Sequence, residues 1–306
     1  MTRPRFCVCV PARNEAARLP ALLEALAAQT ISGRIPVALC LNNSDDGSLA
    51  AVTEVAARHP SRLDIRIDAC VLAPAIAHAG TARGRAMDAG LAIAGDDGVL
   101  ISTDADCRPP LEWIAANLAA IDSGAQVVGG RIVLDDADPI PSAVRAIRAR
   151  YDRYWAAVRA IEDAVDPAPH DPAPRHGDHT GASLTIAASV YRAVGGVPPI
   201  PCGEDRALVI AAVAAGARLV HPISVWTRVS ARTDGRAAGG MATAMASLAD
   251  TIAAGDEPRV AAFAHWRARA QWRRTERARI GAAGMLARER GLPPMPLDMA
   301  LPGLPA

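Results

Sequence analysis

Aromatic residues make up only 3% of the 306-residue sequence, too few for the stacking platforms on which proteins bind single-stranded nucleic acid. Neither sign of charge is in excess, because 33 Lys and Arg residues stand against 32 Asp and Glu residues and the formal net charge is +1. Such a balance exerts no general attraction on a nucleic acid or a charged membrane. We therefore expect no nucleic-acid partner.

Long hydrophobic runs are missing as well. No segment approaches the roughly 18 consecutive apolar residues that a membrane-spanning helix needs, and the run Phe6–Val10 is too short for the hydrophobic part of a signal peptide. No Cys-x-x-Cys pair occurs, and the six cysteines are scattered as Cys7, Cys9, Cys40, Cys70, Cys107 and Cys202. This spacing predicts neither a zinc site nor a disulfide framework. The simplest interpretation is a cytoplasmic protein with buried, reduced thiols.

Strand and helix patterns alternate in the first half of the chain, which at 51% hydrophobic residues can bury a large core. The expected strands are Phe6–Pro11, Val37–Leu41, Asp64–Leu72, Val99–Thr103 and Val127–Leu134. The expected helices cover residues 15–26, 49–56, 82–94 and 109–121, with Asn14 as the N-cap of the first. This order predicts an α/β fold with a mostly parallel sheet covered on both faces.

The second half has a more helical pattern. A long helix is predicted over Ser142–Val165, followed by a proline-rich loop at Asp166–Pro174. The segment from Pro258 to Arg290 reads as an Arg-rich helix with a solvated face; contact with an anionic membrane surface or an acidic partner is the alternative. Residues after Gly291 are rich in proline and are expected to be poorly ordered.

Polar clusters at residues 11–15, 42–48 and 104–106 stand at predicted strand ends, which is where open α/β sheets bind ligands. The sharpest is the Asp-x-Asp sequence of Asp104 and Asp106, whose carboxylates can converge because alternate strand residues point the same way. Two hard oxygen ligands suit Mg²⁺ or Mn²⁺, and such a cation neutralises the charge that builds on a departing diphosphate. The alternative is a solvated turn with two exposed acids.

A second acidic pair, Glu204 and Asp205, precedes a predicted helix. A carboxylate at this place can accept the proton of an attacking hydroxyl, although acids are also favoured in the first turn of any helix. The amides of Asn42 and Asn43 can read the edge of a nucleobase or ribose, or can simply form a turn.

A basic pair, Arg83 and Arg85, precedes Asp88 in a predicted helix. An arginine near a diphosphate forms bidentate, charge-assisted hydrogen bonds, and solvated helix charges are the alternative. His179 is a candidate for an acceptor site; metal binding by His170, His176 and His179 is disfavoured because they lie in a proline-rich loop without i, i+4 spacing.

Taken in order, these residues resemble family 2 glycosyltransferases of the GT-A fold. The segments that carry the resemblance are Val8–Glu15, Leu41–Ser48, Arg85–Leu91, Thr103–Asp106, Gly181–Gly196 and Gly203–Asp205, within residues 5–225. The resemblance implies a Rossmann-like, mostly parallel sheet flanked by helices, with a C-terminal helical extension. It implies a nucleotide-sugar-binding half at 1–135, an acceptor-binding half of the same domain at 136–240, and a helical extension with a flexible tail at 241–306.

The resemblance also implies a role for each matching residue. Donor contacts are expected at Pro11, Ala12, Arg13, Glu15, Asn42, Asn43, Arg85, Asp88 and Asp104. Asp104 and Asp106 are the expected ligands of Mn²⁺ or Mg²⁺, and Asp205 is the expected general base, supported by Glu204. His179, Gly181 and Trp155 are expected to contact the acceptor. In that family a single base and direct displacement invert the configuration at the anomeric carbon.

Three departures from the family pattern matter. Asn42 or Asn43 stands where an aspartate often reads uracil, so the base is uracil or guanine, with a UDP-sugar favoured. Asp88 adds a negative charge where asparagine is common. No histidine follows the strand near Trp226, so Asp106, phosphates and water would hold the metal. The absence of a Gln-x-x-Arg-Trp motif and of membrane helices argues against a processive polysaccharide synthase.

The predicted function is therefore a metal-dependent, inverting, hexosyltransferase-like enzyme that uses a nucleotide-diphospho-sugar and an unidentified hydroxyl acceptor. Two alternatives stay open. A nucleotidyltransferase would want a glycine-rich loop with lysine after the first strand, and Pro11–Arg18 contains neither residue. A non-catalytic nucleotide-sugar-binding module would have no need of the acids at 104, 106, 204 and 205.

Overall fold

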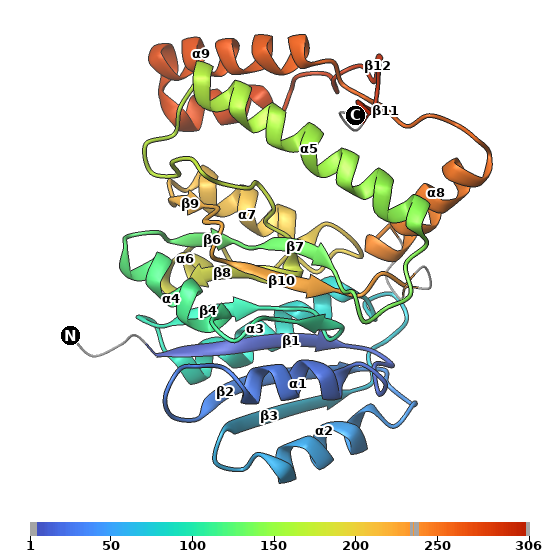
Figure 1. Cartoon of the computed structure of the whole chain (residues 1–306). Coiled ribbons are helices and arrows are strands. Elements are labelled where there is room, and N and C mark those ends of the chain that lie inside the picture. Colours follow the sequence, from blue (N-terminus) through green and yellow to red (C-terminus); the bar gives the residue numbers. More distant parts are fainter. Residues whose placement is uncertain (1–4, 233–234, 236–238, 304–306) are drawn as a thin grey trace. The chain divides into compact units, whose positions relative to one another are not determined.

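The computed structural model describes residues 5–232, 235 and 239–303 (Figure 1). Its described residues divide into two compact units. The first unit comprises Met1–Asp135, Gly177–Ser230 and Arg236–Gly239; the second comprises Asp136–His176, Ala231–Gly235 and Gly240–Ala306. No helix within the described residues combines the length and the apolar character needed to cross a membrane.

A seven-stranded sheet in the order β3-β2-β1-β4-β8-β6-β9 forms the centre of the described part of the first unit. Its strands are β1 (Phe6–Ala12), β2 (Ile35–Asn42), β3 (Leu63–Cys70), β4 (Val99–Ser102), β6 (Val127–Gly129), β8 (Leu184–Ala187) and β9 (Leu219–Val220). All neighbours are parallel except β8, which is antiparallel to both β4 and β6. The predicted α/β class with a mostly parallel sheet is confirmed.

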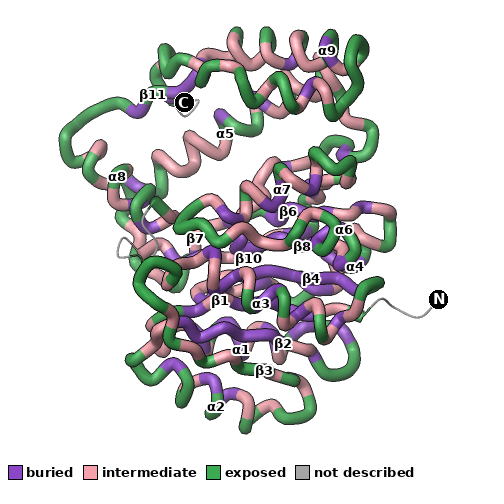
Figure 2. The backbone as a smooth tube through the Cα atoms, turned by 180° about the vertical axis from the view of Figure 1, so that it is seen from behind, coloured by how far each residue is buried: buried purple, intermediate pink, exposed green. Residues whose placement is uncertain are grey.

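Helices pack against this sheet, and in the first half of the chain they alternate with the strands as predicted. They are α1 (Leu19–Ala27), α2 (Ser48–Arg58), α3 (Ala79–Ala94), α4 (Trp113–Asp122), α6 (Ala188–Ala193) and α7 (Glu204–Ala214), with a short 3-10 turn at Gly181–Ser183. Figure 2 shows the buried residues of this unit concentrated along β1, β2 and β4. Because both faces of these strands are covered, they read as continuous apolar runs rather than as alternating ones.

The first helix corrects one expectation. Its predicted apolar stripe is right, since Leu19, Leu22, Leu23 and Leu26 are all buried. The helix begins later than predicted, however, with Arg18 as its N-cap and a proline in its first turn. Asn14 instead lies in the preceding turn with a φ of 53°, and its side-chain oxygen accepts a hydrogen bond from the backbone N–H of Asp45. Asparagine tolerates this left-handed conformation better than most residues.

The segment Val127–Leu134 is a second correction, because it is two strands and not one. It breaks at Gly130 into β6 and β7 (Arg131–Leu134), and β7 belongs to a separate sheet of order β5-β10-β7. The other two strands of that sheet are β5 (Cys107–Arg108) and β10 (Trp226–Val229). A Cβ on Gly130 would lie 1.9 Å from Ser183 Oγ, so the backbone changes sheets where only glycine allows the close approach.

The second unit is built on α5 (Ser142–Val165), α8 (Met241–Ala253) and α9 (Phe263–Glu289). Tyr154 and Val158 of α5 are buried in its core with Val260 and Leu301, and Trp266 packs against them. The long predicted helix over Ser142–Val165 is confirmed, and the predicted Arg-rich helix is kinked at Gly281, where φ is 76°.

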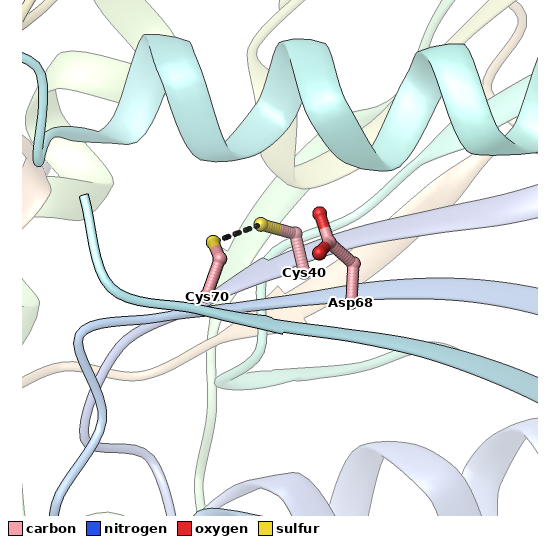
Figure 3. A group of neighbouring side chains, drawn as sticks. All are labelled: Cys40, Asp68 and Cys70. Atoms are coloured by element: carbon pink, nitrogen blue, oxygen red, sulfur yellow. Dashed lines mark hydrogen bonds between the residues drawn. The ribbon is translucent and has the colours of Figure 1, made fainter.

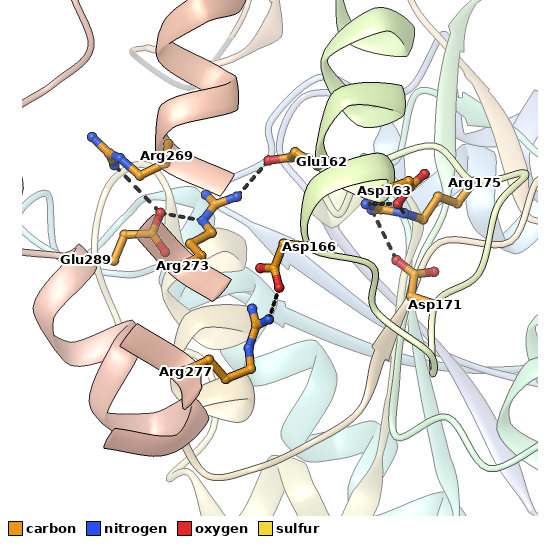
Figure 4. Close-up of polar contacts among 9 residues, drawn as sticks. All are labelled: Glu162, Asp163, Asp166, Asp171, Arg175, Arg269, Arg273, Arg277 and Glu289. Carbon is orange, nitrogen blue, oxygen red and sulfur yellow. Dashed lines mark hydrogen bonds and ion pairs between the residues drawn. The ribbon is translucent and has the colours of Figure 1, made fainter. Parts of the chain in front are cut away.

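The arginines of α9 are less solvated than expected (Figure 4). Arg273 bridges Glu162 of α5 at 2.6 Å and Glu289 at 2.7 Å, and Arg277 pairs with Asp166. In the loop after α5, Arg175 pairs with Asp163 at 2.8 Å in the same way (Figure 4). The solvated-face interpretation is therefore wrong for the side of α9 that faces α5, although Arg267 and Arg274 are exposed.

The proline-rich tail contains regular structure within its described residues. Met299–Ala300 forms β12, which pairs in antiparallel fashion with β11 (Arg259–Val260). Leu301 is 1% exposed in the core of the unit. The expectation of poor order is thus wrong up to residue 303, and residues 304–306 lie outside the described part of the chain.

Candidate active site

The polar clusters of the sequence gather at one edge of the central sheet, where the neighbouring strands β2, β1 and β4 end. Backbone-to-side-chain hydrogen bonds join the first two loops. The N–H of Glu15 donates to Ser48 Oγ at 3.0 Å, and the N–H of Ala16 donates to Asp46 Oδ2 at 2.9 Å. The loops after β1 and β2 therefore form one preorganised surface.

A buried guanidinium, that of Arg83 on α3, holds the centre of this edge. Its Nε donates to Glu204 Oε1 at 2.9 Å, and its Nη2 donates to Asp104 Oδ1 at 2.8 Å. Its Nη1 donates to Ser102 Oγ at 2.8 Å and to the carbonyl of Gly181 at 3.1 Å. One side chain thus connects β4, the loop after it, the 3-10 turn and the start of α7.

Electrostatics keep this guanidinium charged although the Arg83 residue is 5% exposed. Burial by itself lowers the pKa of Arg83, but the negative charges of Asp104, Glu204 and Asp205 raise that pKa above its usual range. A buried charge with several charged hydrogen-bond partners is stable only while those partners are present. Arg83 and the acids around it therefore form a single unit.

Helical periodicity explains why Arg83 and not Arg85 reaches the site. Arg83 lies on the buried stripe of α3 with Met87, Gly90 and Ala94, at spacings of three to four residues. Arg85 falls off that stripe, and its guanidinium binds Asp68 of β3 at 2.7 and 3.0 Å. Arg85, an expected donor contact, therefore lies against β3, and the buried stripe of α3 was the signal in the sequence that pointed to Arg83 at the strand ends.

Asp88, also expected at the donor, has a different partner. Its Oδ1 accepts a hydrogen bond of 2.7 Å from the Tyr191 hydroxyl of α6. Burial and the neighbouring Asp88 raise the pKa of Tyr191, so the tyrosine stays protonated as the donor. Asp88 is therefore an exposed residue whose carboxylate joins α3 to α6 through Tyr191.

The acidic pair of α7 points its two carboxylates at different partners. Glu204 is 4% exposed and faces Arg83. Asp205 accepts hydrogen bonds of 2.6 Å from the N–H of Gly181 through Oδ2 and from the N–H of Arg206 through Oδ1. Gly181 thus links the two ends of the site, because its carbonyl binds Arg83 and its N–H binds Asp205. Acids far apart in sequence meet at one edge through Arg83 and Gly181.

The loop after β4 supplies a group suited to a cation. One possible ligand atom each from Asp104, Asp106 and Cys107 lies within 4.8 Å of the others. Burial, with the nearby Asp104 and Asp106, raises the pKa of the Cys107 thiol well above its usual value, and a soft sulfur is a poorer ligand than a carboxylate for a hard cation. The two carboxylates are hard oxygen ligands, and their proximity fits Mg²⁺ or Mn²⁺.

The two asparagines after β2 differ in how their amides are used. Asn43 donates from Nδ2 to the carbonyl of Leu72 and accepts from the Leu72 N–H, both at 3.0 Å, so its amide extends the pairing of β2 and β3. Asn42 is 2% exposed, and its Oδ1 is buried with no hydrogen-bond partner among the described residues. Of the two, Asn42 has the side-chain oxygen that is suited to a ligand.

The remaining expected contacts are spread over both units. Pro11 and Ala12 end β1, and the Nη1 of Arg13 donates to the carbonyl of Ala77 at 3.2 Å. His179 lies 3.3 Å from His221 between Nδ1 and Nε2; burial, then the His221 ring, lowers its pKa. Trp155 belongs to the second unit, where its ring packs on Trp266 with centroids 5.5 Å apart.

Gly181 is expected to tolerate no side chain. A Cβ there would lie 2.3 Å from Arg83 Cζ, and overpacking of this kind costs about 1–3 kcal/mol. Gly181→Ala should therefore lower the free energy of unfolding by that amount in urea denaturation. Gly84→Ala is the matched control, because a Cβ at Gly84 makes ordinary contacts at 3.6 Å in a helix and should stabilise by about 1 kcal/mol. Equal effects of the two substitutions would contradict the close packing of Gly181 on Arg83.

Comparisons with known proteins agree with this architecture. The structure is similar to S. aureus TarS 1-349 in complex with UDP, with a TM-score of 0.54 and 14% identity over 89% of this chain and 71% of TarS. It is also similar to the mannosyltransferase PcManGT from Pyrobaculum calidifontis in complex with GDP-Man and Mn²⁺, with a TM-score of 0.53 and 18% identity over 95% of this chain and 81% of that one. At these identities the likeness concerns the fold.

Sequence comparison finds a family match. No curated relative matches the chain, but residues 7–157 match the family model described as Glycosyl transferase family 2. That match covers β1, β2, β4 and the Asp-x-Asp loop, the elements that build the edge described above. Residues 7–157, about half of the chain, therefore match glycosyltransferase family 2.

Proposed function

We propose that the chain is a metal-dependent, inverting glycosyltransferase that transfers a sugar from a nucleotide-diphospho-sugar, with UDP favoured as the nucleotide, to a hydroxyl acceptor. The observation that carries the proposal is the junction at Arg83 and Gly181, which joins the Asp-x-Asp loop to the carboxylate of Asp205. A transfer of this kind needs a diphosphate site and a proton acceptor at one edge of the sheet.

The donor would lie across the ends of β1, β2 and β4. Support comes from the buried Asn42 Oδ1, which can accept from an N–H of a nucleobase, and from the preorganised loops that contain Glu15 and Asp46. The related fold of TarS is known in complexes with UDP and with UDP-GlcNAc, and PcManGT in a complex with GDP-Man. Both uracil and guanine donors are therefore to be tested.

Asp104 and Asp106 would hold Mn²⁺ or Mg²⁺. Their carboxylates lie within reach of one another, and carboxylate oxygen suits these hard cations better than the sulfur of Cys107 does. When bound, the cation would neutralise charge on the departing nucleoside diphosphate. Arg83 holds Asp104 at Oδ1, which orients this carboxylate before any ligand arrives.

Asp205 would accept the proton of the acceptor hydroxyl. Two backbone N–H groups orient its carboxylate from the side of Gly181 and Arg206. Glu204 is bound to Arg83 and is 4% exposed, so we assign it to holding Arg83 and not to proton transfer. His179 is an uncharged imidazole near Asp205 whose pKa is lowered by burial, in keeping with an acceptor contact.

Release of nucleotide from sugar nucleotides tests the proposal against its alternatives. Incubation with UDP- and GDP-sugars should yield the nucleoside diphosphate with Mn²⁺ and not with a chelator. Production of pyrophosphate would favour a nucleotidyltransferase. Donor binding without turnover, for every hydroxyl acceptor offered, would favour a non-catalytic module.

Asp106→Ala should abolish the part of donor binding that depends on metal, because it removes one of two hard oxygen ligands. Isothermal calorimetry with a UDP-sugar, with and without Mn²⁺, measures this directly. Glu112→Gln is the control, since Glu112 is an exposed acid on the same unit. Unchanged donor affinity in Asp106→Ala would refute the metal assignment.

A further inference from the structure

Two cysteines thirty residues apart in sequence lie side by side beneath α3 (Figure 3). Cys40 on β2 and Cys70 on β3 have their sulfur atoms 3.8 Å apart. An oxygen of Asp68 joins them, because the three ligand atoms all lie within 4.8 Å of one another. The three side chains point toward α3 from the same face of the sheet (Figure 3).

A disulfide is a poor explanation of this pair. Cys40 is in register with Asp68, and Cys70 with Asn42, so the two cysteines are diagonal neighbours on parallel strands. The sulfurs lie 3.8 Å apart and both cysteines are free, whereas a disulfide needs its sulfurs at about 2.05 Å. Closing the bond would therefore require the two sulfurs to shift toward each other.

A tetrahedral soft cation fits the pair without such a shift. Zinc binds thiolate sulfur at about 2.3 Å, and two such bonds at a tetrahedral angle place the sulfurs about 3.8 Å apart. We propose that Cys40, Cys70 and Asp68 form a binding site for a soft divalent cation of the zinc class. A site with three protein ligands keeps its fourth position for water.

The charges around the pair define how the cation would bind. Burial raises the pKa of the Cys40 thiol, so binding of the cation displaces the proton of this thiol to solvent. Asp68 is held by Arg85 of α3 through both carboxylate oxygens. Ligation by Asp68 therefore displaces at least one Arg85 hydrogen bond, and Arg85 competes with the cation.

This competition connects the site to α3. Arg85 and Arg83 are two residues apart on the helix, and Arg83 holds Asp104 and Glu204. Ligation by Asp68 would therefore loosen one contact between α3 and β3. The hydrogen bonds of Arg83 on the buried face of α3 do not involve Arg85 and would stay in place.

Titration of the full chain with Cd²⁺ tests the proposal, because cadmium–thiolate bonds absorb in the ultraviolet. We expect a saturable signal that excess Mg²⁺ does not displace and that Zn²⁺ does. Cys40→Ala and Cys70→Ala should each abolish it, and Asp68→Asn should weaken binding roughly tenfold or more. Arg85→Ala should strengthen binding roughly two- to fivefold, because it removes the competing charge.

Two control variants keep the test independent of the donor site. Cys202→Ala removes an exposed cysteine, and Cys107→Ala removes the thiol beside Asp104 and Asp106; both should retain the signal. If Cys40→Ala, at a fully buried position, does not fold, Cys70→Ala at the half-buried position decides. The proposal would be overturned if the wild-type chain gave no cadmium signal. It would also be overturned if the signal survived in Cys70→Ala or was lost in Cys107→Ala. None of these measurements depends on glycosyl transfer.

Discussion

Replacement of Asp205 by Asn is expected to reduce turnover by about 10²–10⁴-fold, which is the usual contribution of a positioned base. The amide is nearly isosteric with the carboxylate but cannot accept the proton of a hydroxyl. Donor affinity should stay within about twofold, since Asp205 is placed at the acceptor side of the site and a twofold change is only about 0.4 kcal/mol. Initial rates of nucleoside diphosphate release and calorimetry of donor binding measure the two quantities.

The hydrogen bonds of Asp205 require a control. An asparagine can accept from only one of the N–H groups of Gly181 and Arg206, which both donate to Asp205 at 2.6 Å. Thermal unfolding of the variant shows whether this loss disturbs the fold. Asp97→Asn, an exposed site on the same unit, should change neither rate nor stability. A rate near that of the wild type in Asp205→Asn would remove Asp205 from the proposed role.

Replacement of Arg83 by Met is expected to lower the free energy of unfolding by about 3–5 kcal/mol, the cost of leaving a buried charge without its partner. Glu204 is 4% exposed and would lose the guanidinium to which it is bound. Arg85→Met is a matched control on the same helix. Arg85 also forms an ion pair, with Asp68, but the Arg85 side chain is 44% exposed. An exposed pair of this kind contributes about 1 kcal/mol or less.

Urea denaturation of both variants measures the difference. The double variant Arg83→Met with Glu204→Gln should lose less stability than the sum of the two single variants, because no buried charge is left without its counter-charge. Equal losses in Arg83→Met and Arg85→Met would contradict the central position of Arg83. Metal-dependent donor binding should fall in Arg83→Met and not in Arg85→Met, because only Arg83 binds Asp104.

Local patterns in the sequence predicted much of this fold. The leucine stripe of α1 and the apolar runs of β1, β2 and β4 indicated which residues would be buried, and these residues are buried. The polar clusters at the ends of those strands indicated the edge of the sheet at which these side chains gather. These signals are local, because periodicity and turn chemistry depend on residues a few positions apart.

Other features depended on contacts that a linear pattern does not contain. The chain changes sheets at Gly130, between β6 and β7, where Ser183, more than fifty residues later, packs against the glycine. Arg83 and not Arg85 is buried at the strand ends, because Arg83 lies on the face of α3 that packs against the sheet. Cys40 and Cys70 show no metal-ligand spacing in sequence, and only the pairing of β2 with β3 brings their sulfurs to 3.8 Å.

The amino-acid sequence by itself indicated the resemblance to glycosyltransferase family 2, the alternation of strands and helices in the first half of the chain, and the acids that stand at the strand ends. The tertiary structure decided which of those acids share a partner, because Arg83 binds Asp104 and Glu204 only once α3, β4 and α7 have packed together. The physical reason is the cost of burial: a guanidinium can leave water only where several oxygen acceptors from distant segments converge on it.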